Sequence, residues 1–105
     1  MEGIKVKIIE YIDGSQPGWV RCSFIDAFGV EWFIVEKVPV VTKEFLDEKS
    51  LYPKYGIVAG QIQNSYVDEN NEEIITINTE TPWDIEAENG EKIFKIKRDQ
   101  VVNFD

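Results

Sequence analysis

Apolar and polar residues alternate along several short stretches of the chain, which is the pattern of half-buried β-strands. The first such stretch is residues 4–8, where aliphatic side chains occupy one face and two lysines the other. Apolar residues continue to Ile12, and we expect a bulge where the alternation shifts. Residues 13–18 follow as a turn, with Pro17 and Gly18 suited to the central positions of a type II turn.

Residues 18–41 predict a long β-hairpin that folds back at residues 26–29. Large apolar side chains fall on both faces of its two strands, so we expect both faces to be covered along much of the hairpin. A small barrel or a tightly coiled sheet provides that cover. Pro39 cannot donate to a strand ladder and indicates an edge, a bulge or a strand exit.

The rest of the chain predicts one short helix and several short strands. The helix is expected at residues 42–49, with Thr42 as its N-cap. The remaining expected elements are a strand at 57–67 with a bulge or close approach at Gly60, a turn at 68–73, a return strand at 74–79, a hairpin that joins 85–88 to 92–97 through a type I′ turn at Asn89-Gly90, and a closing strand at 101–104.

These elements predict an all-β fold in a single domain that covers residues 1–105. We favour a small antiparallel, Greek-key-like β-barrel of seven to eight strands, because closure removes the edges that short strands expose. A two-sheet β-sandwich is the alternative.

Five segments of the chain form a recognisable set: Pro17-Gly18-Trp19-Val20, Asp26 with Gly29, 36–42, Tyr52-Pro53 and Thr81-Pro82-Trp83. Together they resemble segments of a group of small bacterial β-rich proteins of unassigned function. The resemblance covers most of the chain. Some members of such groups are immunity proteins beside polymorphic toxins, and others resemble β-barrel modules of translation factors. The resemblance assigns no role to any residue.

The composition argues against most kinds of catalysis. The chain has no histidine, which removes the commonest general base and the usual transition-metal ligand, and it has no glycine-rich phosphate loop. Cys22 is in register with apolar neighbours and is expected to be a buried hydrophobic residue. The acidic turn at 68–73 lacks the glycine and the final glutamate of an EF-hand. We therefore expect neither an enzyme nor a bound cofactor or metal.

Location follows from the same features. A single cysteine forms no internal disulfide, which favours a reducing compartment. No apolar run approaches the roughly 20 residues that span a bilayer, and the N-terminal residues do not resemble a signal peptide. A cytoplasmic protein is the expectation.

Charge gives the best indication of function. The net charge is −9, which disfavours nucleic acid and anionic membranes as partners. Residues 64–91 contain nine acidic residues and no basic one. Trp83 lies in this window outside any clean alternation, where it either anchors a partner or plugs one end of the barrel. The candidate partner-binding residues are Asp68, Glu72, Glu73, Trp83, Asp84, Glu86 and Glu88.

Two functions are predicted from these observations. The first is a non-catalytic protein-interaction domain that binds a basic partner, with an immunity or inhibitor protein as one form of it. The second is a barrel that binds a small molecule or sugar in a mouth lined by Trp32, Tyr66 or Trp83. The sequence leaves the oligomeric state open between a monomer and a homodimer.

Overall fold

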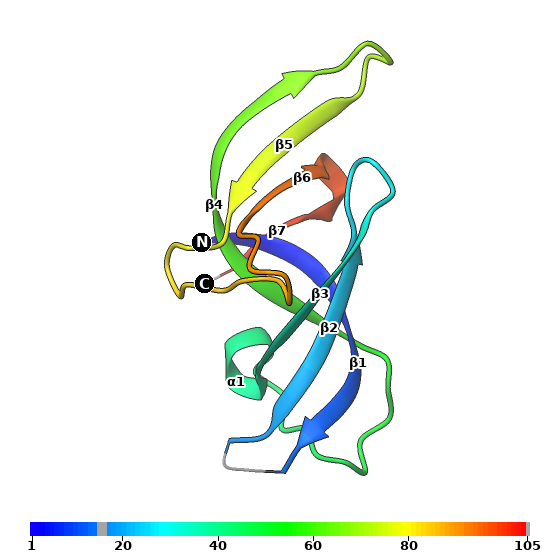
Figure 1. The fold of residues 1–105 in the computed structure, drawn as a ribbon, viewed down its shortest axis with the longest axis vertical. Helices are drawn as coiled ribbons and strands as arrows, with labels where there is room; N and C mark the ends of the chain where they lie inside the picture. The colour runs from blue at the N-terminus through cyan, green and yellow to red at the C-terminus, as the bar shows by residue number, and fades with distance from the viewer. Residues whose placement is uncertain (15–16, 105) are drawn as a thin grey trace.

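The computed structural model describes residues 1–14 and 17–104 of the chain. Within these residues the fold is all-β and barrel-like, as the sequence predicts (Figure 1). Its elements in chain order are β1 (Glu2–Asp13), β2 (Trp19–Ile25), β3 (Glu31–Lys37), α1 (Val38–Val41), β4 (Lys54–Val67), β5 (Glu73–Asn78), β6 (Ile93–Lys97), the 3₁₀ turn η1 (Arg98–Gln100) and β7 (Val101–Asn103).

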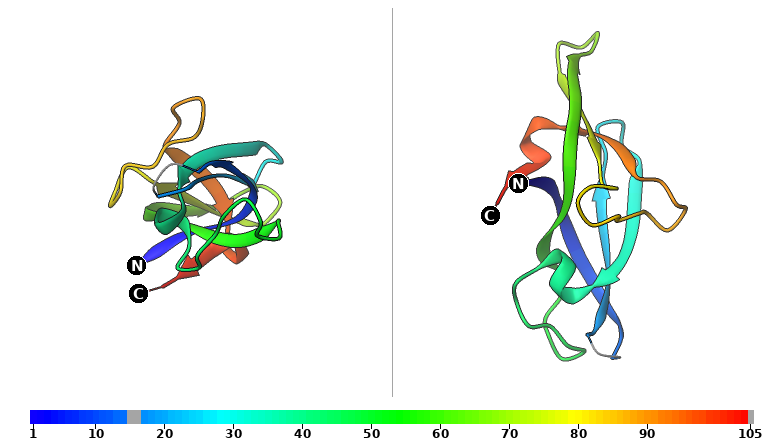
Figure 2. Two further views of the ribbon diagram at one scale, coloured as in Figure 1. Left: turned by 90° about the horizontal axis from the view of Figure 1, so that it is seen from below. Right: turned by 90° about the vertical axis from the view of Figure 1, so that its left-hand side faces the viewer.

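The strands form one antiparallel sheet in the order β3-β2-β1-β4-β5-β6, with β7 added to β1. Two long strands organise this sheet. β1 pairs with β4 along one edge, and with β7 and then β2 along the other. β4 pairs with β1 over its first half and with β5 over its second half. The sheet curls around its own inner face (Figure 2), which fits the barrel-like prediction rather than two separate sheets.

Single hydrogen bonds and ring contacts join the two ends of the curled sheet. The Ala27 amide donates to the Lys95 carbonyl at 2.9 Å, and the Glu88 amide donates to the Phe33 carbonyl at 2.8 Å. The Phe94 ring of β6 makes edge-to-face contacts with Phe24 and Trp32, at centroid distances of 5.2 and 5.1 Å. Side-chain packing therefore brings β6 against the β2–β3 hairpin where the strand ladder is not continuous.

The interior is filled by aliphatic and aromatic side chains from the inward faces of the strands. The predicted inner face of β2, with Val20, Cys22 and Phe24, is buried, and so are the alternating aliphatic residues of β1. The opposite face of the β2–β3 hairpin is half covered, since the Arg21 guanidinium lies over the Phe33 ring at 4.1 Å. This bears out the expected two-sided cover in part.

The structure corrects the prediction for residues 38–49. The hairpin ends at Lys37, and Val38–Val41 form a single helical turn with Pro39 in its first positions, where proline's fixed φ and missing N–H are tolerated. No helix forms at 42–49. The side chains of Thr42 and Asp47 instead accept hydrogen bonds from the backbone amides of Glu44 and Lys49, and such local bonds compete with a helix.

The predicted third hairpin is also wrong in its first arm. Residues 85–88 are not a strand: the Ala87 amide does bond across the turn to the Glu91 carbonyl, but the Ile85 amide donates to the Thr79 carbonyl and the Glu88 amide to the Phe33 carbonyl. Gly90 has a positive φ of 91°, whereas Asn89 does not, so the turn is not of type I′. Burial of Ile85 and Ala87 in the core holds this arm away from the sheet ladder.

Two local predictions are confirmed. A Cβ on Gly60 would lie 2.8 Å from Cγ1 of Ile77, so the glycine marks a close approach between β4 and β5. β1 has register shifts between Ile8 and Glu10 and between Tyr11 and Asp13, where the alternation slips. The type II turn predicted at Pro17-Gly18 includes residue 16 and lies outside the described residues.

Candidate functional site

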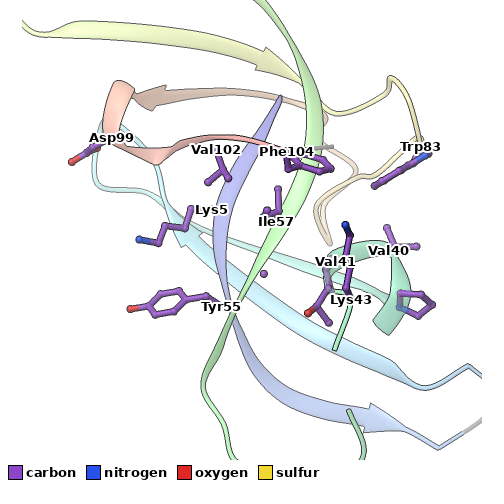
Figure 3. A pocket seen from close by; sticks show the side chains of 13 residues that line it. Lys5, Val40, Val41, Lys43, Tyr55, Ile57, Trp83, Asp99, Val102 and Phe104 are labelled. Atoms are coloured by element: carbon purple, nitrogen blue, oxygen red, sulfur yellow. The ribbon is translucent and has the colours of Figure 1, made fainter. Parts of the chain in front are cut away.

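A groove of about 620 Å³ lies on the outer surface between α1, β4 and the C-terminal strand (Figure 3). Apolar side chains from four separate parts of the chain line it: Val40, Ile57, Trp83, Val102 and Phe104. A volume of this size lies within the usual range for binding pockets, roughly 300–1,000 Å³. The groove is therefore the best-formed candidate site among the described residues.

Close contact between α1 and β4 forms the floor of the groove. A Cβ on Gly56 would lie 2.8 Å from the Val41 carbonyl oxygen, so a glycine at this position allows the two backbones to meet. Val41 is buried in the core, which leaves its neighbour Val40 to face the groove. The helical turn α1 thus supplies one apolar wall.

Trp83 is presented by a turn that the core anchors. The Asp84 amide donates to the Glu80 carbonyl at 2.8 Å, and Asp84 has a positive φ of 52°. Ile85 is fully buried, and the Thr79 hydroxyl donates to its carbonyl oxygen at 2.5 Å. Trp83 itself is 47% exposed and lines the groove, so it does not plug an end of the barrel.

Three charged side chains border the groove: Lys5, Lys43 and Asp99. Lys5, Tyr55 and Asp99 lie together at one end, and Lys43 and Trp83 lie toward the other (Figure 3). The Lys5 ammonium stands 5.0 Å from the centre of the Tyr55 ring. In the part of the chain that the structure describes, neither lysine forms an ion pair with a carboxylate.

The acidic window of residues 64–91 is largely paired within the molecule. Five of its nine acids form ion pairs with bases outside it: Glu72 with Lys97, Glu73 with Arg98, Glu80 and Asp84 with Lys92, and Glu88 with Arg21. A hydrogen bond from Arg98 lowers the pKa of the Glu73 carboxyl. In the described residues, Glu69 and Glu86 are exposed acids of this window that form no ion pair.

The predicted partner-binding residues fall into two separate groups. Asp68, Glu72 and Glu73 lie at the far end of the β4–β5 hairpin, which projects along the 45 Å axis of the molecule (Figure 1). The other group, with Trp83, Asp84, Glu86 and Glu88, belongs to the segment between β5 and β6. The structure therefore does not bring all seven residues into one face.

The aromatic residues proposed for a ligand-binding mouth also lie apart. Trp32 is half-buried, and its indole N–H donates to the Asp26 carboxylate at 2.9 Å. Tyr66 lies on the projecting hairpin, 5.2 Å from the Lys95 ammonium. Trp83 alone lines the groove. These three residues do not form one shared mouth.

The Cys22 thiol and the Asp68 carboxylate have structural roles. Cys22 is fully buried, and burial, with a smaller contribution from the charge of Glu36, raises the pKa of its thiol to about 12. The Asp68 carboxylate accepts hydrogen bonds from the amides of Asn70 and Glu72, which closes the turn. Among residues 1–14 and 17–104, no three histidine, cysteine or acidic side chains cluster closely enough to hold a metal ion.

Sequence reasoning identified Trp83 but missed the other residues of the groove. The outward position of Lys5 was visible in the alternation of β1, whereas the positions of Lys43, Tyr55 and Phe104 depend on long-range packing. Nothing in the local sequence indicates that Phe104 folds back beside Met1. In the structure, the Phe104 amide donates a hydrogen bond of 2.8 Å to the Met1 carbonyl.

Comparison of the chain with protein-family models, with curated proteins and with solved structures gives no match to any of the three. A search of the described helices finds none with the length and hydrophobicity to cross a membrane.

Proposed function

We propose that this chain is a non-catalytic protein-interaction domain that binds a basic partner protein at the groove beside Trp83. The observation that carries the proposal is the half-exposed indole of Trp83 in an apolar groove, on a fold whose core is already filled. Tryptophan is among the residues that contribute most at interfaces, above all next to a pocket that excludes water.

The acidic residues of the chain are the reason for proposing a basic partner. Glu86 is exposed on the segment that carries Trp83 and forms no ion pair among the described residues, whereas Glu80 and Asp84 share the single lysine Lys92. The net charge of −9 favours encounter with a basic surface. An immunity or inhibitor protein that masks a basic toxin in the cytoplasm is one protein of this kind. Because many acids of the window are paired within the chain, we place the centre of the proposed contact at the Trp83 turn and not over the whole window.

The direct test compares Trp83→Ala with Phe45→Ala. Phe45 is 86% exposed and lies outside the groove, so its variant controls for the loss of an exposed aromatic ring. A partner isolated on immobilised wild-type protein should bind Trp83→Ala at least about tenfold more weakly and Phe45→Ala unchanged, as measured by calorimetry. Equal binding of wild type and Trp83→Ala would overturn the groove as the contact centre.

A second comparison tests the charge of the partner. Glu69 and Glu86 are suitable for reversal to lysine, because reversal of Glu72, Glu73 or Glu88 would also break an ion pair within the chain. The matched control reverses Glu10 and Glu48, which are exposed outside the window. The first double variant should slow association several-fold more than the control at low salt, with the difference fading as salt rises. Equal rates would contradict an acidic contact face.

A small-molecule ligand is the second candidate, favoured by the volume of the groove, which suits a ligand as well as a peptide. A metabolite mixture that shifts the amide resonances of Ile57, Val102 and Phe104 in an NMR titration would support it. If no compound moves these resonances while a partner protein does, the protein-interaction function stands alone.

A further inference from the structure

The basic residues are used differently in two parts of the molecule. Lys92, Lys97 and Arg98 all form ion pairs with acids of the 64–91 window. Across the described residues, the Lys43 side chain, like those of Lys7 and Lys49, has no hydrogen bond, ion pair or ring contact, although the chain holds twenty acidic residues against eleven basic ones. Of these three lysines, Lys43 is the one that lines the groove. An ammonium left without a carboxylate in so acidic a protein is available to an incoming group.

Lys43 is also placed where an incoming group would meet it. It lies two residues after the end of α1 and lines the groove, and its side chain points toward Phe104 and Trp83 (Figure 3). Lys5 stands at the other end of the groove beside Tyr55. Asp99 lies near Lys5 and not near Lys43, so the carboxylate of the groove does not offset the Lys43 charge.

The apolar walls make the charge of Lys43 matter more once the groove is filled. A segment that covers Trp83, Val40 and Phe104 removes water from around the ammonium group, and an ammonium that loses water without gaining a partner opposes binding. A carboxylate on the same segment restores the lost interactions, and charge pairs are stronger where water is excluded.

We propose that the groove binds a partner segment that combines an aliphatic or aromatic side chain, seated against Trp83, with a neighbouring carboxylate paired to Lys43. This inference rests on the proposed protein-interaction function and defines the segment that enters the site. A partner that is basic overall can carry such a segment, because the charge of −9 acts at long range, whereas Lys43 acts only on groups in contact with it.

The test uses short unlabelled peptides with capped ends, in which a single residue is flanked by leucines. That residue is aspartate in the first peptide, asparagine in the second and lysine in the third. A single carboxylate limits long-range repulsion from the acidic protein, and salt at about 0.15 M screens what remains. We expect isothermal titration calorimetry to show roughly tenfold tighter binding of the aspartate peptide than of the asparagine peptide.

Matched variants assign the preference to one side chain. Lys43→Met keeps the apolar stem and should reduce the affinity for the aspartate peptide to that for the asparagine peptide, whereas Lys49→Met, an exposed lysine outside the groove, should leave the preference intact. Trp83→Ala should weaken the binding of both peptides. Circular dichroism and thermal melting verify that each variant is folded.

Three outcomes would overturn the inference: equal affinities for the aspartate and asparagine peptides, tightest binding of the lysine peptide, or a preference that survives Lys43→Met. If binding in any of these cases still depends on Trp83, the groove remains the interaction site and only the acidic segment is wrong. If none of the peptides binds at millimolar concentration, a short segment is not the occupant and the inference fails as well. The comparison of Trp83→Ala with Phe45→Ala then decides the proposed function independently.

Discussion

The groove and the acidic window of residues 64–91 differ in how completely their charges are paired within the molecule. The window contains nine acids, and five of these form ion pairs within the chain, which partly neutralise their charge. The groove is mainly apolar and has few charged side chains, but in the described residues its Lys43 has no partner at all. The groove thus has fewer charged side chains than the acidic window, but its Lys43 is more available to a partner than the paired acids are.

This difference shows that the density of charge along a sequence does not locate the free charges on a surface. Ion pairs between exposed residues stabilise a fold only weakly, but they do reduce the charge that a partner meets. A binding site is better located where a charge and apolar surface are both left uncovered. Trp83 belongs to both regions, since it lies in the acidic segment and lines the groove.

The largest expected effect separates the support of the Trp83 turn from its exposed surface. Ile85 is fully buried two residues from Trp83, so Ile85→Ala should lower the free energy of unfolding by about 2–5 kcal/mol. Trp83→Ala should cost about 1 kcal/mol, because much of the indole is already in water. Urea denaturation followed by far-UV circular dichroism measures both values. Equal losses would mean that Trp83 is part of the core and not a free contact.

A smaller effect tests the hydrogen bond that fixes the same turn. The Thr79 side chain is buried, and its hydroxyl donates to the Ile85 carbonyl, so Thr79→Val leaves that oxygen without this donor. The expected loss of stability is about 1–3 kcal/mol. Thr81→Val, at an exposed position in the same segment, should change stability by less than about 0.5 kcal/mol. A loss at Thr81 as large as that at Thr79 would contradict an anchoring role for the Thr79 hydroxyl.

The smallest expected effect concerns the paired acids. The hydrogen bond from Arg98 lowers the pKa of Glu73, so the ionised carboxylate is favoured in the folded state. The resulting stabilisation is present above the pKa that Glu73 has in the unfolded chain, and it is lost as the pH falls through the lowered value. An NMR titration of the Glu73 carboxyl carbon should give a pKa below that of a free glutamate, and Arg98→Gln should raise it. If the pKa of Glu73 were unchanged in Arg98→Gln, the ion pair between Arg98 and Glu73 would not be the cause of the lowered pKa.

Much of the fold follows from local sequence patterns. Alternation places the inner faces of β1 and β2 correctly, and turn residues such as Gly29, with its φ of 83°, locate the first hairpin. The errors at residues 42–49 and 85–88 have a common cause. In both segments some backbone amides bond to local side chains or to carbonyls outside the predicted element, and those partners are defined only by the folded structure.

The site is predictable only in part. Trp83 stood out because its proline neighbour breaks the strand pattern, and the structure confirms that its side chain is partly exposed. Lys43 gave no local signal, since the sequence predicts that it lies on a short surface helix that does not form. Its importance depends on the approach of α1, β4 and Phe104, which are far apart in the chain.

Because Met1 and Phe104 are adjacent, the order of the segments along the chain can be changed while their arrangement in space is kept. Their backbones share a hydrogen bond of 2.8 Å, and both chain ends lie on the same side of the molecule (Figure 2). A short glycine-rich linker can therefore join them, and the chain can be reopened between Glu69 and Asn70 at the exposed tip of the β4–β5 hairpin. Such a circular permutant divides the acidic tip while every wall of the groove stays on continuous chain.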